Sequence, residues 1–185
     1  GFVERFPFNK LVRNDINGLI VIMISSGEGC LKINGKEYTA QAGTLISLLP
    51  FHLIENHYVS DNFSCNYLLY RFDFMADFPF VLKSEISERI GNKPYLILNP
   101  DEYEHLNEFY SFISKQYNRY DHPSREEIIK AQLFSFIAEL SFIYSRQTLR
   151  LSTNRQDQIV DDFFRLLHAH HKKERNLSFY ADKLC

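Results

Sequence analysis

Short apolar runs separated by glycines occupy the first part of the chain. Five of the seven glycines fall between residues 18 and 43, and the apolar runs lie at 19–24, 30–33, 37–40, 44–49 and 67–74. Runs of this length, bounded by turn residues, predict β-strands. Asn34-Gly35 stands between two of the runs and is the strongest short-range signal for a β-hairpin. The pattern predicts an antiparallel sandwich or small barrel over about 1–80.

The spacing of apolar residues changes to three and four in the second part, which predicts helices over about 101–147. The first helix is expected from Asp101 to Tyr120, and the second from 125 to about 146. The second helix is apolar around most of its circumference, so it must be covered on two sides. One cover can be the sheet, and the other is either another helix of the same domain or a second subunit. We favour a homodimer, with an interface formed by Ile129, Leu133, Phe136, Ile137 and Leu140.

A polar stretch at 148–154 separates this region from the end of the chain and is typical of an interdomain linker. An amphipathic helix is expected over 155–171. Another helix is expected to begin at Ser178, and the chain stops at Cys185 inside that helix. Two such helices have no core of their own. The segment 155–185 is therefore interpreted as the truncated start of a second domain.

Composition and charge narrow the class of protein. The chain of 185 residues has 24% charged residues and a formal net charge of −2, so no whole-chain basic surface indicates a nucleic-acid or membrane partner. The longest uninterrupted apolar run, 19–24, is far too short to span a membrane. No signal peptide is visible, and three widely spaced cysteines favour a reducing compartment. We expect a cytoplasmic protein with no membrane partner.

Candidate catalytic chemistry is sparse. His52, Glu55 and His57 are close in sequence, but an odd separation places the two histidines on opposite faces of a strand, and a solvated loop or strand end is the favoured interpretation. Cys30 and Cys65 fall on predicted strands and are expected to be small core residues. The sequence contains neither a nucleophile elbow nor a phosphate-binding loop. We therefore expect no catalytic residue, no metal and no cofactor.

Two segments resemble one family of proteins. Residues 27–38 (GEGCLKINGKEY) and 42–50 (AGTLISLLP) resemble the cupin sensor domain of AraC/XylS-type transcription regulators. Residues 159–164 and 175–185 resemble the opening of the DNA-binding domain of that family. The chain departs from the sensor pattern at Thr44, where an acid is usual, and at Phe51, where a glycine is usual. The resemblance extends over the whole chain in the family's order of sensor, dimer helices, linker and reader.

The resemblance implies both a fold and a function. The implied fold is mostly β plus α: a cupin-like antiparallel β barrel (double-stranded β-helix, or jelly roll), followed by dimerisation helices, in a domain spanning 1–147. The implied function is transcription regulation by a small-molecule effector held in the barrel. DNA is the implied partner of the full-length parent only, since this chain carries one helix of the first helix-turn-helix and part of the next. The alternative function is a metal-dependent cupin enzyme acting on a small molecule.

The resemblance also implies ligand-binding positions. Matching the sugar contacts of the family's arabinose-responsive member places ligand contacts at Val12, Asn56, Tyr67 and Leu69. Arg13 is adjacent to the first of these and is a candidate partner for an anionic ligand. We expect the ligand to change how the segment 2–13 packs on the barrel, and so to shift the placement of two reader domains.

Overall fold

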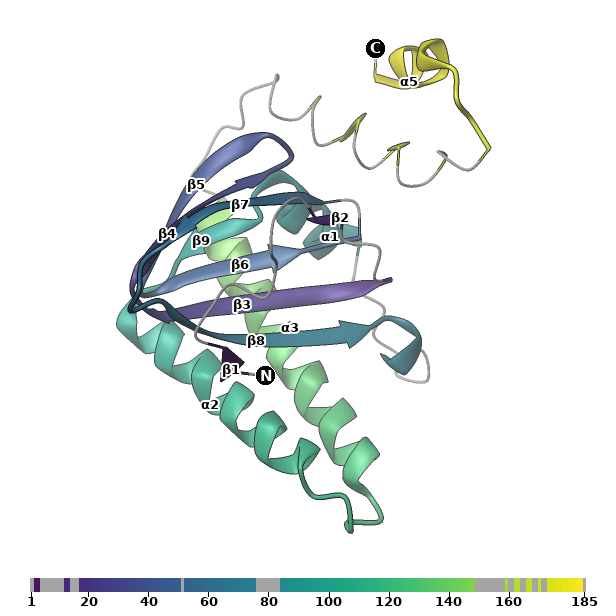
Figure 1. Cartoon of the computed structure of the whole chain (residues 1–185). Coiled ribbons are helices and arrows are strands. Elements are labelled where there is room, and N and C mark those ends of the chain that lie inside the picture. The colour runs from purple at the N-terminus through teal and green to yellow at the C-terminus, as the bar shows by residue number, and fades with distance from the viewer. Residues whose placement is uncertain are drawn as a thin grey trace.

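The computed structural model describes residues 2–3, 12–13, 17–50, 52–75, 84–148 and 173–184, together with 159, 162–163, 166–167 and 170. Two antiparallel sheets form its β layer (Figure 1). The five-stranded sheet has the order β1 (Phe2–Val3), β8 (Ser64–Arg71), β3 (Gly18–Ser26), β6 (Thr44–Leu48) and β9 (Tyr95–Ile97). The four-stranded sheet has the order β2 (Val12–Arg13), β7 (Leu53–Val59), β4 (Glu28–Ile33) and β5 (Lys36–Gln41).

The predicted antiparallel β architecture is confirmed, but its extent is larger than the sequence indicated. Strand β9 lies beyond the expected boundary near residue 80 and pairs with β6 as the edge of the five-stranded sheet. Strand β7 was not predicted, because its residues mix polar and apolar types. Among the described residues no strand pair joins the two sheets, so a closed barrel is not observed.

The Asn34-Gly35 hairpin is confirmed. Asn34 has φ 51° and Gly35 has φ 81°, the left-handed pair of conformations that a type I′ turn requires. The β4 and β5 strands on either side pair in register from Ile33 opposite Lys36 to Glu28 opposite Gln41. The local sequence therefore determines this hairpin.

Four helices and one short 3-10 turn complete the described fold. They are η1 (Asp73–Met75), α1 (Ser84–Asn92), α2 (Pro100–Tyr117), α3 (Arg125–Thr148) and α5 (Leu177–Leu184). Helix α2 begins with a capping box, in which the Asn99 side chain accepts from the Glu102 amide and the Glu102 carboxylate accepts from the Asn99 amide. The predicted helices over 101–120 and 125–146 are confirmed as α2 and α3, whereas α1 was not predicted.

The five-stranded sheet separates two apolar clusters. Its inner face packs against the four-stranded sheet through side chains such as Ile20, Ile22, Leu31 and Ile54. Its outer face packs against the helices through a second cluster. Strand β3 is buried along most of its length because both of its faces are covered. This explains why the run 19–24 is continuously apolar instead of alternating.

Helix α3 is covered on both sides within one chain. It packs against α2 and α1 (Figure 1) and against the outer face of the five-stranded sheet. The alternative cover considered from the sequence, another helix of the same domain, is the one observed. Helix α3 is also long and apolar enough to cross a membrane. This is only weak evidence for a membrane span, because the core helix of a soluble protein has the same length and composition.

This packing corrects the expected dimer face. The five residues assigned to it all lie in the core of a single chain, with exposed fractions from 0 to 6%. In this conformation they present no surface to a partner. The outward side of α3 carries a different large apolar side chain, Phe142, which is 53% exposed. The five residues are Ile129, Leu133, Phe136, Ile137 and Leu140.

The segments after α3 are described only in part. Apart from Thr148, which ends α3, the expected linker 148–154 lies outside the described residues, as do most positions of the expected helix 155–171; the described ones at 159, 162–163, 166–167 and 170 are helical. Helix α5 agrees with the helix expected from Ser178. Its buried side chain is Tyr180, 3% exposed, whereas Leu177 is 75% exposed.

Candidate functional site

One row of side chains along β8 faces the space between the two sheets. Strand β8 pairs with β3 so that Tyr67 lies opposite Ile22 and Leu69 opposite Ile20. Directly opposed residues in an antiparallel pair point to the same face. Since Ile20 and Ile22 belong to the inter-sheet cluster, Tyr67 and Leu69 face the inter-sheet space as well.

The inner row is exposed to solvent at Leu69. Ile20 has an exposed fraction of 0%, whereas Leu69, opposite it on the same face, is 44% exposed. Tyr67 is half-buried and packs against the inter-sheet cluster. Strand β8 is next to the edge of its sheet, with only the two-residue strand β1 beyond it. An apolar surface between sheets that reaches the outside is the kind of place where a small ligand binds.

An ion pair lies at the end of the row. Arg71 follows Tyr67 and Leu69 on the same face of β8, opposite Gly18. Its guanidinium donates to the Asp73 carboxylate through Nη2, at 2.6 Å from Oδ2, and through Nε, at 3.0 Å from Oδ1 and 3.1 Å from Oδ2. The bonded guanidinium lowers the pKa of Asp73, and both groups are solvent-exposed. Arg71 had no signal in the sequence, because its place in this row becomes visible only once the β3–β8 register is known.

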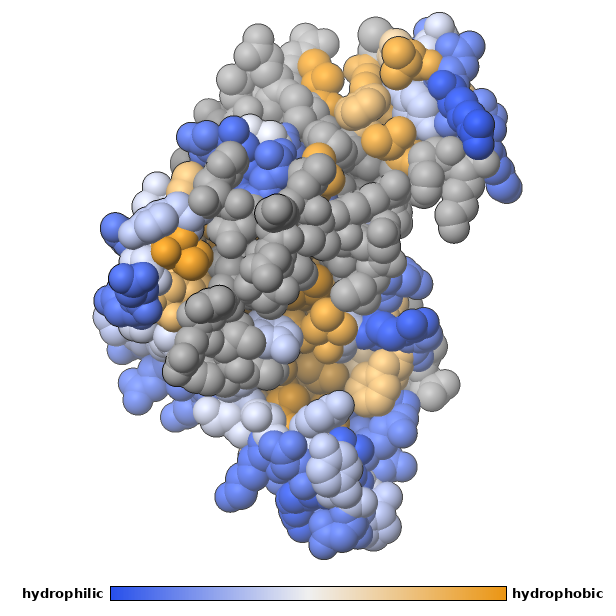
Figure 2. All heavy atoms as spheres, viewed as in Figure 1, coloured by the Kyte–Doolittle hydropathy of each residue, from blue (hydrophilic) through white to orange (hydrophobic). Residues whose placement is uncertain are grey.

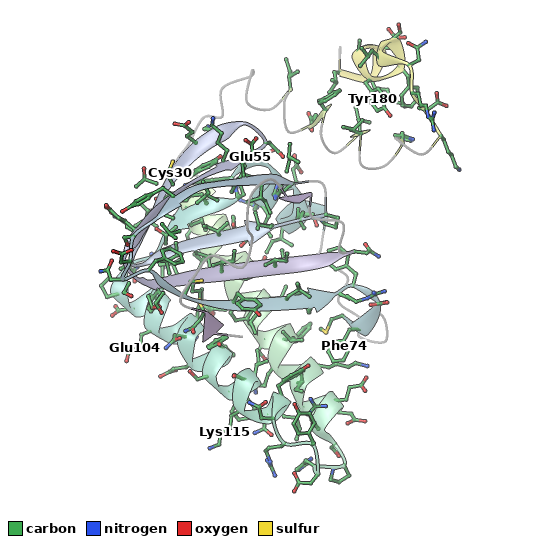
Figure 3. The ribbon with its side chains drawn as sticks, in the orientation of Figure 1. Cys30, Glu55, Phe74, Glu104, Lys115 and Tyr180 are labelled. Atoms are coloured by element: carbon green, nitrogen blue, oxygen red, sulfur yellow. The ribbon has the colours of Figure 1, made fainter. Side chains whose placement is uncertain are left out.

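The other end of the row is a buried thiol. Cys65 lies opposite Ile24, is fully buried, and burial raises its pKa to about 11. It is a core residue, as expected, and stays protonated at neutral pH. Cys30 is only half-buried on β4 (Figure 3), so its expected place in the core is wrong.

The other predicted ligand residues are placed by backbone register alone. Val12 in β2 lies opposite Ile54, and Asn56 in β7 lies opposite Leu31. Both partners belong to the inter-sheet cluster. Arg13 stands at the alternate register, opposite Leu53. The side chains of these three predicted residues lie outside the described part of the chain, and ligand binding by any of them stays a prediction.

The residues considered for a metal are not brought together. His52 is buried between β6 and β7, where its Nδ1 accepts a hydrogen bond from the Leu49 amide at 3.1 Å. The expectation that it is solvated is therefore wrong. Glu55 is half-buried on β7, and the His57 side chain lies outside the described residues. No group of three His, Cys, Asp or Glu side chains suited to a metal ion occurs within the described residues.

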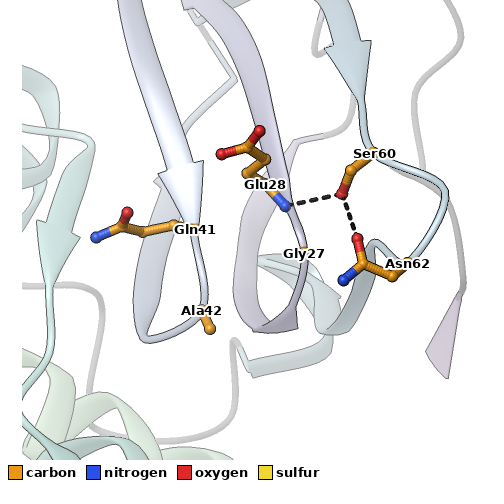
Figure 4. A pocket seen from close by; sticks show the side chains of 6 residues that line it. All are labelled: Gly27, Glu28, Gln41, Ala42, Ser60 and Asn62. Carbon is orange, nitrogen blue, oxygen red and sulfur yellow. Dashed lines mark hydrogen bonds between the residues drawn. The ribbon is translucent and has the colours of Figure 1, made fainter.

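A shallow polar pocket lies at the end of the sandwich where three turns meet. Gly27, Glu28, Gln41, Ala42, Ser60 and Asn62 line it (Figure 4). The Ser60 hydroxyl accepts from the Glu28 amide at 2.9 Å and donates to Asn62 Oδ1 at 2.8 Å. Ser60 therefore bonds both Asn62 and the Glu28 amide, which is typical of a structural turn.

The outer face of the α2–α3 pair is mostly polar, whereas the inner row on β8 carries the apolar and aromatic side chains of Leu69 and Tyr67. Glu104 and Lys115 project from α2 away from the sheet (Figure 3), and Figure 2 shows mostly hydrophilic residues over the free end of the α2–α3 pair. On the sheet side, Asn66 Nδ2 of β8 donates to Asn107 Oδ1 of α2 at 2.9 Å. This bond joins the strand that carries the inner row to the helix layer.

Comparison with known proteins finds similar structures but no sequence family. No protein-family model matches the sequence, and no curated protein matches it. The AraC-like transcriptional activator CuxR aligns over 93% of this chain and 58% of its own, with TM-score 0.46 and 10% identity. Unsaturated fatty acid-bound wild-type ToxT from Vibrio cholerae strain SCE256 aligns over 99% of this chain and 66% of its own, with TM-score 0.46 and 14% identity.

A third solved structure, ToxT from Vibrio cholerae O395, aligns over 96% of this chain and 65% of its own, with TM-score 0.44 and 14% identity. Of the three structures, the two from Vibrio cholerae are of ToxT, and CuxR is an AraC-like transcriptional activator. The chain spans less than two thirds of the length of each of them.

Proposed function

We propose that this chain is the effector-sensing region of an AraC-type transcription regulator, joined to the start of its DNA-binding domain. The observation that carries the proposal is the order of the two motif segments. The sensor-like segment 27–50 forms consecutive strands of the sandwich, and the reader-like segment 175–185 contains α5. Helices α2 and α3 lie between them, where the family has its dimer helices. In this proposal the two sheets form a cupin-like jelly-roll barrel, and the chain is not an enzyme.

The effector site in this proposal is the open inner face beside β8. Tyr67 and Leu69 supply apolar and aromatic surface, and Val12 and Asn56 stand opposite inner-face residues on the neighbouring sheet. An apolar molecule with one polar or anionic group suits this surface, since pockets for small molecules combine apolar walls with few polar contacts. Arg71 offers a cation at the end of the row once its contact with Asp73 is exchanged for a ligand anion.

A dye-binding experiment tests this site. Anilinonaphthalene sulfonate, an apolar anion, should bind the native chain, and Leu69→Glu should weaken binding about tenfold because it removes apolar surface and adds a negative charge. Ile97→Glu is the matched control, since Ile97 is also largely exposed but lies on the edge strand β9. Equal dye binding by the two variants, at unchanged circular dichroism, would exclude the inner face of β8 as the site.

We also propose that the protein forms a homodimer. Because the five core residues of α3 are unavailable, the dimer contact is assigned to the outward side of the helix pair, where Phe112 of α2 and Phe142 of α3 are exposed. The protein is proposed to act in the cytoplasm, without a membrane partner.

DNA binding by a longer product of the same gene tests the function itself. The gene is expected to continue past the Cys185 codon and to encode a second helix-turn-helix. The longer protein should retard a DNA fragment carrying its target promoter in a salt-dependent manner, while residues 1–185 should not. The control is a fragment of equal length and unrelated sequence. A reading frame that ends near Cys185, or stoichiometric metal and turnover in the purified chain, would contradict the proposal and favour a metal-dependent cupin enzyme.

A further inference from the structure

Two tyrosines join the edges of the two sheets, close to the strand that the end of α3 contacts. Tyr38 of β5 and Tyr95 of β9 stack with ring centroids 5.3 Å apart. The Tyr95 hydroxyl donates to the Thr39 carbonyl oxygen at 2.7 Å. Strand β5 is the edge of the four-stranded sheet and β9 is the edge of the five-stranded sheet. Tyr95 therefore fastens the edge of one sheet to the edge of the other.

The end of α3 is attached to the same place. Tyr144 of α3 is fully buried in the cluster between the helices and the outer face of the five-stranded sheet. Less than one turn later, Gln147 Nε2 donates to the Ile97 carbonyl oxygen of β9 at 3.0 Å. Helix α3 ends at Thr148, directly after these contacts. We call Tyr38, Tyr95 and Gln147 the tyrosine corner.

The opposite side of the sandwich has the open inner row. There Leu69 is exposed although Ile20 opposite it is fully buried, whereas the β5–β9 side is joined by a ring stack and a hydrogen bond. A two-layer structure that is fastened along one side and open along the other can change its spacing by rotating about the fastened side. Because Gln147 of α3 bonds β9 at that side, such a rotation would change the contact between β9 and the last turn of α3.

We propose that the tyrosine corner couples the spacing of the two sheets to the last turn of α3, and so to the direction in which the chain leaves that helix. The coupling itself is a property of residues 38–148 and needs neither effector nor DNA. Its regulatory use rests on the proposed function: an effector that enters between the sheets would act through the corner on the segment that leads to α5.

Hydrogen–deuterium exchange on the chain of 185 residues tests the coupling. Tyr95→Phe removes the bond to Thr39 and keeps the ring that stacks on Tyr38. We expect the backbone amides of the last α3 turn, 145–148, to exchange about two- to tenfold faster, the effect of losing one hydrogen bond. Amides in the middle of α3, at 133–140, should be unchanged. Unchanged exchange at 145–148, or a uniform increase along α3, would overturn the proposal.

Tyr180→Phe is the matched control. It removes a hydroxyl that also donates to a backbone oxygen at 2.7 Å, that of Glu174, but in the segment of α5. It should leave exchange at 145–148 unaltered.

A double-mutant cycle gives a second measure of the coupling. Combining Tyr95→Phe with Gln147→Ala should change the unfolding equilibrium constant by some factor. That factor should differ by about twofold or more from the product of the factors measured for the two single variants. Strict multiplicativity would show that the two contacts are independent and would refute the corner. Since neither test involves DNA or an effector, its failure would leave the proposed function standing, and the failure of DNA binding would leave the coupling standing.

Discussion

Replacing Phe136 by alanine should lower the free energy of unfolding by about 3–5 kcal/mol, the usual cost of truncating a buried aromatic residue. Phe136 has an exposed fraction of 0% and lies among the side chains of α2, α3 and the outer face of the five-stranded sheet. Its ring also makes an edge contact with Phe109, at 6.4 Å between centroids. Urea unfolding followed by circular dichroism measures the effect.

Phe142→Ala is the control for Phe136→Ala, because the same change is made on the same helix at a side chain that is 53% exposed. It should alter the free energy of unfolding by no more than about 0.5 kcal/mol. Light scattering should show a weaker dimer for Phe142→Ala, since the outward side of α3 is the assigned contact. A stable, monomeric Phe136→Ala would mean instead that this residue contacts a partner and not the core.

Gly27→Ala should be the second strongly destabilising change, at about 2–5 kcal/mol. Gly27 has φ +75°, and a Cβ there would lie 2.6 Å from Phe63 Cα and 2.7 Å from Phe63 N. The left-handed conformation costs a non-glycine residue about 1–2 kcal/mol, and forcing a methyl against fixed backbone costs about 1–3 kcal/mol more. The Phe63 backbone cannot move away freely, because its amide donates to the Ser60 carbonyl oxygen at 3.0 Å.

Gly35→Ala separates the two causes. Gly35 has φ +81°, but a Cβ there would meet nothing within 4 Å. It should cost only the conformational strain of about 1–2 kcal/mol. Thermal and urea unfolding of the two variants under the same conditions give the comparison. Equal losses at Gly27 and Gly35 would show that the crowding at Phe63 relaxes without cost.

Structural elements that depend only on residues close together in the sequence were predictable from the sequence alone. The Asn34-Gly35 turn, the strands of the glycine-punctuated segment and the extents of α2 and α3 all follow from local conformational preferences and from the period of the apolar residues. The presence of a two-sided apolar helix was also visible. These features need no knowledge of which distant segments meet.

The tertiary structure decided which segments cover one another. It placed the inward side of α3 against its own sheet and α2, so that residues such as Phe136 became core and left Phe142 outside. It added β9 to the five-stranded sheet and buried His52 in the turn between β6 and β7. Periodicity shows that a face is apolar, but the identity of its cover depends on contacts between residues far apart in the chain.

The candidate site was also predicted only in part from the sequence. The sequence, through a family resemblance, selected Tyr67 and Leu69, and their shared face follows from the alternation of a strand. Only the β3–β8 register shows that this face lies between the sheets, that it continues to Arg71, and that it is open at Leu69. The tyrosine corner had no sequence signal, because Tyr38, Tyr95 and Gln147 are far apart in the sequence and are linked only through tertiary contacts. Local sequence thus determined the elements, and the long-range pairing of those elements decided the inner row and the corner.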